Sequence, residues 1–269
     1  MGGRLRRTAG IALRQYYLLR GSPARVLALY AWILVDIVLW GFITRYLNTM
    51  ASPGTDFVPV LLGAVLLWDF FTRVMHSVTT GFLEDVWSQN FLNLFASPLS
   101  IREYLGGLVL FSVATSLLGL VAMVVLASAA FGLRFFAYGL MLVPFLLTLF
   151  LFGIALGILG IALVLRFGPA SEWLVWPIPA VVTPFAAVFY PVSTLPAWMQ
   201  RISHLLPPSH VFEGMRAIMG GGAHSGNALL WGLGLCALYI LLAAWVFEWV
   251  HRRVVRSGLL ARYKAESSA

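Results

Sequence analysis

Residues 137–165 read AYGLMLVPFLLTLFLFGIALGILGIALVL and contain no charged side chain. About 20 apolar residues, at a rise of about 1.5 Å each, are enough for an α-helix to cross the roughly 30 Å hydrocarbon core of a bilayer. The stretch therefore predicts a membrane-spanning helix. Gly153 and Gly157 within it form a Gly-x-x-x-Gly pattern, which favours the close approach of a second helix.

The whole chain has the composition of a membrane protein. Of its 269 residues, 61% are hydrophobic and 10% are charged, and the mean hydropathy is +0.90. A soluble domain carries roughly 25% charged residues, and a soluble fold of this length cannot bury so much apolar surface. We therefore expect an all-α integral membrane protein with a single transmembrane domain over residues 1–269.

Similar apolar stretches recur along the chain and predict six spans in all. They cover residues 25–47, 57–81, 103–131, 137–165, 172–191 and 227–250. The fifth span holds Pro177, Pro179 and Pro184, and proline removes a backbone donor and kinks a helix. Because lipid cannot satisfy the freed carbonyl groups, we expect this span to pack inside the bundle as a candidate pore wall.

The distribution of basic residues predicts the orientation. The net charge of +8 comes mainly from arginines near the two ends, and positive residues favour the cytoplasmic side of a membrane. If the N-terminus is inside, the outer segments hold only Arg45, Arg134, Arg201 and Arg216. Both termini are therefore expected in the cytoplasm, with residues 251–269 as a tail. The charge then indicates contact with anionic membrane lipids, not with nucleic acid.

Residues 4–20 predict a helix that lies in the membrane interface. The segment is rich in arginine, and apolar side chains recur in it at helical spacing. These apolar residues are Leu5, Ala9, Ala12, Leu13, Tyr16 and Tyr17.

The connector at residues 82–102 predicts a short amphipathic helix that ends at Ser97-Pro98. One apolar stripe follows helical spacing and consists of Leu83, Val86, Trp87, Phe91, Leu94 and Phe95. Glu84 and Asp85 lie in its first turn, where the helix dipole favours acidic side chains. Such a helix either covers lipid headgroups or docks a cytosolic partner.

Four ionisable residues lie inside predicted spans and away from their ends, namely Asp36, Asp69, Arg73 and His76. Each ionised residue costs about 2.5–3.5 kcal/mol at mid-bilayer, so these side chains are expected to face protein or water. Asp69 and Arg73 share a helix face, and Asp36 lies at a similar depth. The group is either a structural ion pair or part of a polar translocation path.

Two stretches resemble the permeases of ABC-2 type exporters. The first is the connector with the following SPLS at residues 97–100 and Gly106-Gly107. The second is FYPVSTLPAWMQRISHLLPPSHVFEGMR at residues 189–216, which is similar to the [FY]-P-x-S-x-L-P pattern of that family. The motif positions here are Tyr190, Pro191, Ser193, Leu195, Pro196, Pro207, Pro208 and Arg216.

The resemblance implies the transmembrane subunit of a bacterial exporter in the cytoplasmic (inner) membrane. Such a subunit pairs with a second copy to form a pore and works with P-loop ATP-binding subunits. Residues 83–97 would be a cytoplasmic coupling helix, and residues 192–222 would form short extracellular helices that re-enter the membrane. The positions implied to contact the partner are Glu84, Asp85, Trp87, Asn90 and Phe91.

The sequence itself contains no standard P-loop. That motif needs a Gly-Lys-[Ser/Thr] ending, and the single lysine here, Lys264, follows Tyr263. We therefore expect no enzyme activity and no cofactor or metal on this chain, with ATP and Mg²⁺ held by the partner.

Two other classes remain open on the sequence. One is a stand-alone channel or secondary carrier that uses the intramembrane Asp and Arg residues. The other is a membrane enzyme that uses His204, His210 or Glu213. The exported substrate could be a glycan, a lipid-linked molecule or a drug.

Overall fold

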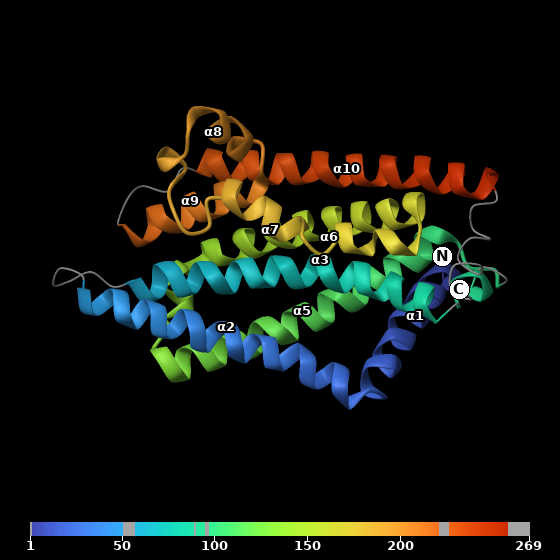
Figure 1. Cartoon of the computed structure of the whole chain (residues 1–269), viewed down its shortest axis with the longest axis horizontal. Helices are drawn as coiled ribbons and strands as arrows, with labels where there is room; N and C mark the ends of the chain where they lie inside the picture. The colour runs from blue at the N-terminus through green and yellow to red at the C-terminus, as the bar shows by residue number, and fades with distance from the viewer. Residues whose placement is uncertain (1, 51–56, 89, 95–96, 221–225, 258–269) are drawn as a thin grey trace.

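The computed structural model describes residues 2–50, 57–88, 90–94, 97–220 and 226–257. The described part of the chain is built from helices and contains no β-strand. Figure 1 shows most of the long helices lying side by side in one bundle, with α1 running across one end of it, in agreement with the all-α fold expected from composition. The long helices are α1 (Gly2–Arg20), α2 (Pro23–Met50), α3 (Gly63–Trp87), α5 (Ile101–Phe131), α6 (Leu142–Phe167) and α10 (Gly226–Arg256).

Shorter elements join the long helices. A π-helical turn, η1 (Val58–Leu62), leads into α3, and the 3-10 segment η2 (Phe135–Met141) leads into α6. The remaining short elements are α4 (Phe91–Leu94), η3 (Pro169–Leu174), α7 (Ile178–Val182), η4 (Thr183–Phe185), η5 (Val192–Thr194), α8 (Ala197–His204) and α9 (Pro207–Met219).

Among the described residues, five helices are long and apolar enough to cross a membrane. They overlap five of the six predicted spans, and they are Pro23–Met50, Val58–Trp87, Ile101–Phe131, Gly139–Phe167 and Asn227–Arg256. The chain is therefore a multi-pass membrane protein by the length and composition of its helices.

The segment predicted as the fifth span, residues 172–191, is not a continuous helix. It consists of the end of η3, then α7 and η4, and then irregular backbone. Pro177, Pro179 and Pro184 lack the N–H groups that would continue the hydrogen-bond ladder, so the helix is broken repeatedly. In Figure 1 this segment runs back from the end of α6 towards α8 and α9. A membrane crossing by this broken segment stays a prediction.

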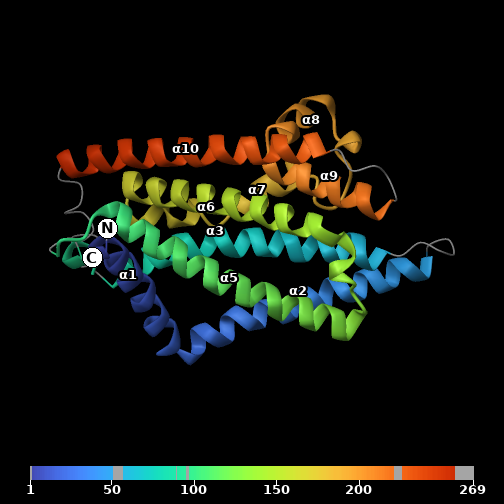
Figure 2. The ribbon, with the colours of Figure 1, turned by 180° about the vertical axis from the view of Figure 1, so that it is seen from behind.

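The two ends of the bundle differ. In Figures 1 and 2, α1 and the last turns of α10 lie at one end, here called the α1 end, whereas α8 and α9 lie at the opposite α8 end. Both views place the start of the chain and the last described turn of α10 at the α1 end. Termini on one side of a membrane require an even number of crossings, as the six-span prediction has.

Helices α3 and α6 form the centre of the bundle through the predicted glycine pattern. A Cβ atom on Gly153 would lie 2.9 Å from Cγ1 of Val74, and one on Gly157 would lie 2.9 Å from Cβ of Val78. Real Cβ atoms do not come so close, so glycine at these positions permits the contact. The Thr79 hydroxyl also donates a 3.3 Å hydrogen bond to the Gly157 carbonyl oxygen.

Helix α1 covers the whole predicted interface helix and uses its two faces differently. The side chains of Ile11 and Gln15 are buried against the bundle, and Gln15 Nε2 donates a 3.2 Å hydrogen bond to the Gly81 carbonyl oxygen of α3. Leu5, Leu13, Tyr16 and Tyr17 of the predicted apolar stripe are exposed instead. The apolar face is therefore free for lipid, as expected of an interfacial helix.

Close packing of α1 on α5 depends on Gly107. A Cβ atom at this position would lie 2.5 Å from Cβ of Ile11 and 2.8 Å from the Thr8 carbonyl oxygen. No other residue type fits this position without moving α1.

Candidate functional site

The connector does not form the single helix predicted for residues 83–97. Residues 83–87 are the last turns of α3, which ends where the Ser88 N–H donates to the Glu84 carbonyl oxygen at 3.0 Å. A separate short helix, α4, follows after a break. The apolar residues keep helical spacing whether the segment forms one helix or the end of α3 followed by α4. Periodicity alone therefore could not show where α3 ends.

Asp85 lies inside the protein rather than on a docking surface. Its side chain is fully buried, Tyr104 donates a 2.7 Å hydrogen bond from its hydroxyl to Oδ2, and Arg14 forms an ion pair with Oδ1. Asp85 thus joins α3 to both α1 and α5. Its carboxylate is not available to a partner in this conformation, which corrects the expectation that it lies on the surface.

Glu84 is also engaged within the chain. Its Oε1 atom lies 2.9 Å from Nη1 of Arg25 at the start of α2, and 16% of its side chain is exposed. The two acidic residues of the connector therefore hold α1 and α2 against α3. A contact of Glu84 with a partner stays a prediction.

Trp87 is the exposed end of α3. Half of its side chain is exposed, and its Nε1 atom donates a 2.7 Å hydrogen bond to Oε2 of Glu172 in η3. This bond links the end of α3 to η3 at the α1 end of the bundle. Asn90 is half-buried, and the side chain of Phe91 lies outside the described residues. The exposed surface that begins at Trp87 also includes the polar residues Ser88, Asn93 and Ser97.

Helix α5 begins with a capping box that was not predicted from the sequence. The Glu103 N–H donates to Oγ of Ser100 at 3.3 Å, and the Ser100 N–H donates to Oε2 of Glu103 at 3.0 Å. Ser-x-x-Glu before an apolar stretch is the signal that could have found it.

Arg7 of α1 completes this cap. Its Nη2 atom donates to Oε1 of Glu103 at 2.7 Å and its Nε atom to Oε2 at 3.0 Å. The hydrogen bond to Glu103 raises the pKa of the Arg7 guanidinium, a side chain that is charged at physiological pH in any case. Together with the Arg14–Asp85 pair, it gives α1 two charged anchors on the bundle.

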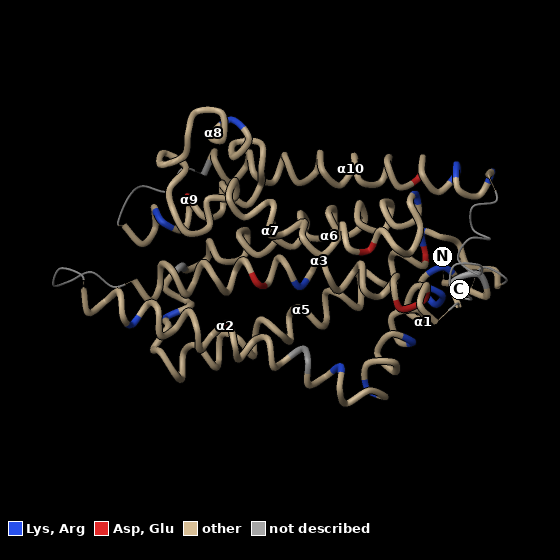
Figure 3. The backbone as a smooth tube through the Cα atoms, viewed as in Figure 1, with Lys and Arg blue, Asp and Glu red and all other residues tan. Residues whose placement is uncertain are grey.

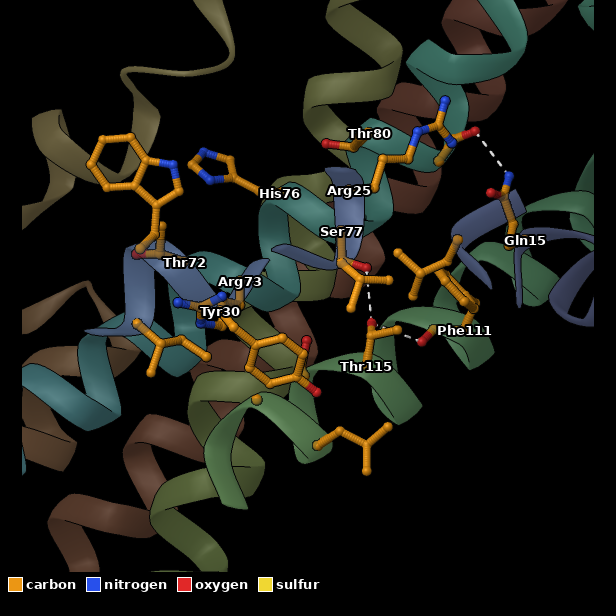
Figure 4. A pocket seen from close by; sticks show the side chains of 18 of the residues that line it. Gln15, Arg25, Tyr30, Thr72, Arg73, His76, Ser77, Thr80, Phe111 and Thr115 are labelled. Carbon is orange, nitrogen blue, oxygen red and sulfur yellow. Dashed lines mark hydrogen bonds between the residues drawn. The ribbon is translucent and has the colours of Figure 1, made fainter. Parts of the chain in front are cut away.

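The four intramembrane polar residues line one cavity of about 730 Å³ between α2, α3 and α5. Figure 4 shows Arg73, His76 and Ser77 of α3 around this space, with Tyr30 from α2 and Thr115 from α5. The ion pair joins Nε of Arg73 to Oδ2 of Asp69 at 2.7 Å, within α3. This bond lies within one helix, and the choice between a structural ion pair and a polar translocation path stays a prediction.

Charged residues lie within the length of the apolar helices as well as at their ends. Figure 3 shows acidic and basic positions on α3 in the middle of the bundle, in addition to those at the α1 end. Since isolated charges are costly in lipid, their position around a shared cavity fits a polar, protein-lined space.

At the α8 end, Arg216 of α9 satisfies the backbone where the broken segment ends. Its Nη2 atom donates to the Ala187 carbonyl oxygen at 2.7 Å, and its Nη1 atom donates to the Val188 carbonyl oxygen at 3.3 Å. Ala187 has a φ of 55°, a strained left-handed conformation for a residue with a Cβ atom. The arginine of the motif thus stabilises a turn.

Glu213 completes the same turn. Its Oε1 atom accepts from Arg216 at 3.0 Å and from the Val192 N–H at 2.7 Å. The Tyr190 hydroxyl donates a 2.8 Å hydrogen bond to the Pro184 carbonyl oxygen.

The other motif residues start or precede the short helices of this end. Pro191 precedes η5, Pro196 precedes α8, and Pro207 and Pro208 open α9 and are buried. Ser193 is exposed and Leu195 half-buried. The motif therefore builds the turns between the broken segment and α9.

The side chains of His210 and Glu213, which the membrane-enzyme alternative would use, are engaged within the chain. A His210 ring nitrogen and the His204 carbonyl oxygen are 3.0 Å apart, and Glu213 is engaged as described. No group of three metal-binding side chains is found in the ranges that the structure describes.

Apolar helices of membrane length, with charged groups gathered around a cavity between them, define a polytopic membrane protein. Residues 23–220 match the family model described as ABC-2 type transporter. The chain therefore belongs to the ABC-2 type transporter family. The matched range includes α2, α3 and α5 around the cavity, the connector, and the turns at the α8 end. The search of curated proteins finds no match to the chain.

Proposed function

We propose that this chain is the permease subunit of an ATP-driven exporter, that it works as a dimer, and that a separate subunit binds ATP and Mg²⁺. Family membership supports this proposal, because an ABC-2 membrane domain associates in general with an ATP-binding subunit. In this proposal the α1 end lies in the cytoplasm of a bacterium and the α8 end outside, an orientation that the positive-inside rule favours.

The observation that carries the coupling part of the proposal is the continuity of α3. This helix runs unbroken from Gly63 to Trp87, so it carries both the cavity residues and the tryptophan at its exposed end. A partner that moves the end of α3 would move Asp69 and Arg73 with it. In this proposal the contact surface consists of Trp87, Ser88, Asn93 and Ser97, while Asp85 anchors the helix from inside.

Co-purification tests the partner. The chain would be expressed with the ATP-binding subunit encoded by a neighbouring gene, and recovery of that subunit would be measured by affinity capture of the permease. We expect Trp87→Ala and Asn93→Arg to lower its recovery. Trp198→Ala at the α8 end, which also truncates an exposed tryptophan, should leave recovery unchanged.

A second candidate is a stand-alone channel or secondary carrier. The observation in its favour is the charged cavity, since such proteins use intramembrane carboxylates for ion coupling. Transport by the purified chain alone in liposomes, without ATP, would favour this candidate and overturn the exporter proposal.

A further inference from the structure

The charges that line the cavity do not balance. Asp69 pairs with Arg73 at 2.7 Å, and Glu84 pairs with Arg25 at 2.9 Å. Asp36 of α2 also lines the cavity, and no ion pair or hydrogen bond of its side chain is found within the described residues. The cavity therefore carries one surplus carboxylate beside two neutralised pairs.

Two other polar atoms of the cavity lining lack a partner. The Ser116 side chain of α5 is 2% exposed, and its Oγ atom makes no hydrogen bond to the described chain. Nε2 of His76 on α3 is likewise buried and unpartnered. A buried polar atom without a hydrogen bond is costly. Two such atoms, on α3 and α5, together with the half-buried carboxylate of Asp36 on α2, point to a bound polar molecule.

The outer part of the cavity is apolar, aromatic and open to the side of the bundle. Trp32 and Tyr30 of α2 and Leu118 of α5 contribute to its lining and are 67%, 42% and 63% exposed. Trp176 lies beside His76, with the two ring centres 5.0 Å apart. Aromatic faces attract organic cations, and exposed apolar side chains on predicted spans suit a ligand that arrives from the lipid.

We infer that this cavity binds an amphipathic organic cation. The positive group lies against Asp36, where Ser116 and His76 supply further polar contacts. The apolar part lies along Tyr30, Trp32 and Leu118. An anion of the same size is disfavoured, because each guanidinium of the lining already contacts a carboxylate. The assignment of this cation as exported cargo rests on the proposed function, but its binding does not.

Direct binding of tetraphenylphosphonium tests the inference. The purified full chain would be placed in phosphatidylcholine nanodiscs without a partner subunit, and binding would be measured by equilibrium dialysis. We expect saturable binding of this cation and none of tetraphenylborate, an anion of nearly the same shape. Asp36→Asn should weaken the affinity at least about tenfold, whereas Asp36→Glu should retain most of it.

A steric variant tests the place of binding without removing a charge. A Cβ atom on Gly119 would lie 3.4 Å from Cδ of Arg73, so Gly119→Leu extends into the cavity and should abolish binding. The matched control is Gly234→Leu in α10, where a Cβ atom meets nothing within 4 Å. Glu248→Gln, which removes a carboxylate elsewhere, should also bind normally.

The arms of the experiment separate the possible outcomes. Competition by added phosphatidylethanolamine would identify a lipid amine as the natural source of the cation, and its absence would indicate a free cation. Equal binding of both ions, or unchanged binding by both Asp36→Asn and Gly119→Leu, would overturn the inference. Cation binding without ATP-dependent transport would instead contradict only the proposed function.

Discussion

Asp85 shows how a single residue can connect distant parts of the chain. Its carboxylate binds Arg14, far before it in the sequence, and Tyr104 after it. Removing one member of a buried charged pair leaves the other without compensation, which costs roughly 3–5 kcal/mol. The acidic residue that resembled a surface contact in the sequence is thus an internal anchor of α1.

We predict that Asp85→Asn lowers the free energy of unfolding by roughly 3 kcal/mol or more, because Arg14 loses its buried counter-charge. Glu84→Gln, at a partly exposed pair, should cost about 1 kcal/mol or less. Denaturant unfolding of both variants in the same detergent measures the difference. Equal stabilities would show that Asp85 does not anchor α1.

At the scale of elements, the long apolar helices were predictable and the connections were not. Composition and apolar length indicate the spans, because lipid imposes a helix of fixed minimum length. The prolines of residues 172–191 signalled a kink, but their combined effect breaks the helix entirely. The stripe of residues 83–94 could not show that its first part belongs to α3.

The candidate site was predictable in part. The spacing of Asp69 and Arg73 identified their shared face, and the depth of Asp36 placed it at the same level. Burial of Asp85 and the turn contacts of Arg216 depend on residues far apart in sequence, so no local pattern revealed them. The capping box at Ser100 was readable from its spacing but was not recognised.

The close packing of α1 on α5 at Gly107 can be tested by substitution. Gly107→Leu should displace α1, because the added side chain occupies the positions of Ile11 and the Thr8 backbone, and overpacking of this kind typically costs about 1–3 kcal/mol. Limited proteolysis would detect the displacement as faster cleavage within residues 2–20. Gly10→Leu is the control, since a Cβ atom at Gly10 meets nothing within 4 Å. Equal cleavage of the two variants would contradict this account of the contact.

For the whole molecule, α3 connects the exposed surface at the α1 end to the cavity, and α1 and α5 fix that helix through Asp85. At the opposite end, the turns held by Arg216 and Glu213 lead into α9, which packs against α6 and α10. In the proposed function, this arrangement would carry a movement caused by ATP on a partner subunit to the cavity.

The most direct test of ATP-driven coupling is the accessibility of the cavity in the complex with the ATP-binding subunit. Ser116→Cys would be introduced with Cys236→Ala, and its rate of reaction with a small maleimide measured with and without ATP. Leu238→Cys, at an exposed position of α10, is the control. We predict that ATP changes the Ser116→Cys rate only in the complex and leaves the control unchanged. A rate that does not respond to ATP in an assembled complex would contradict the account.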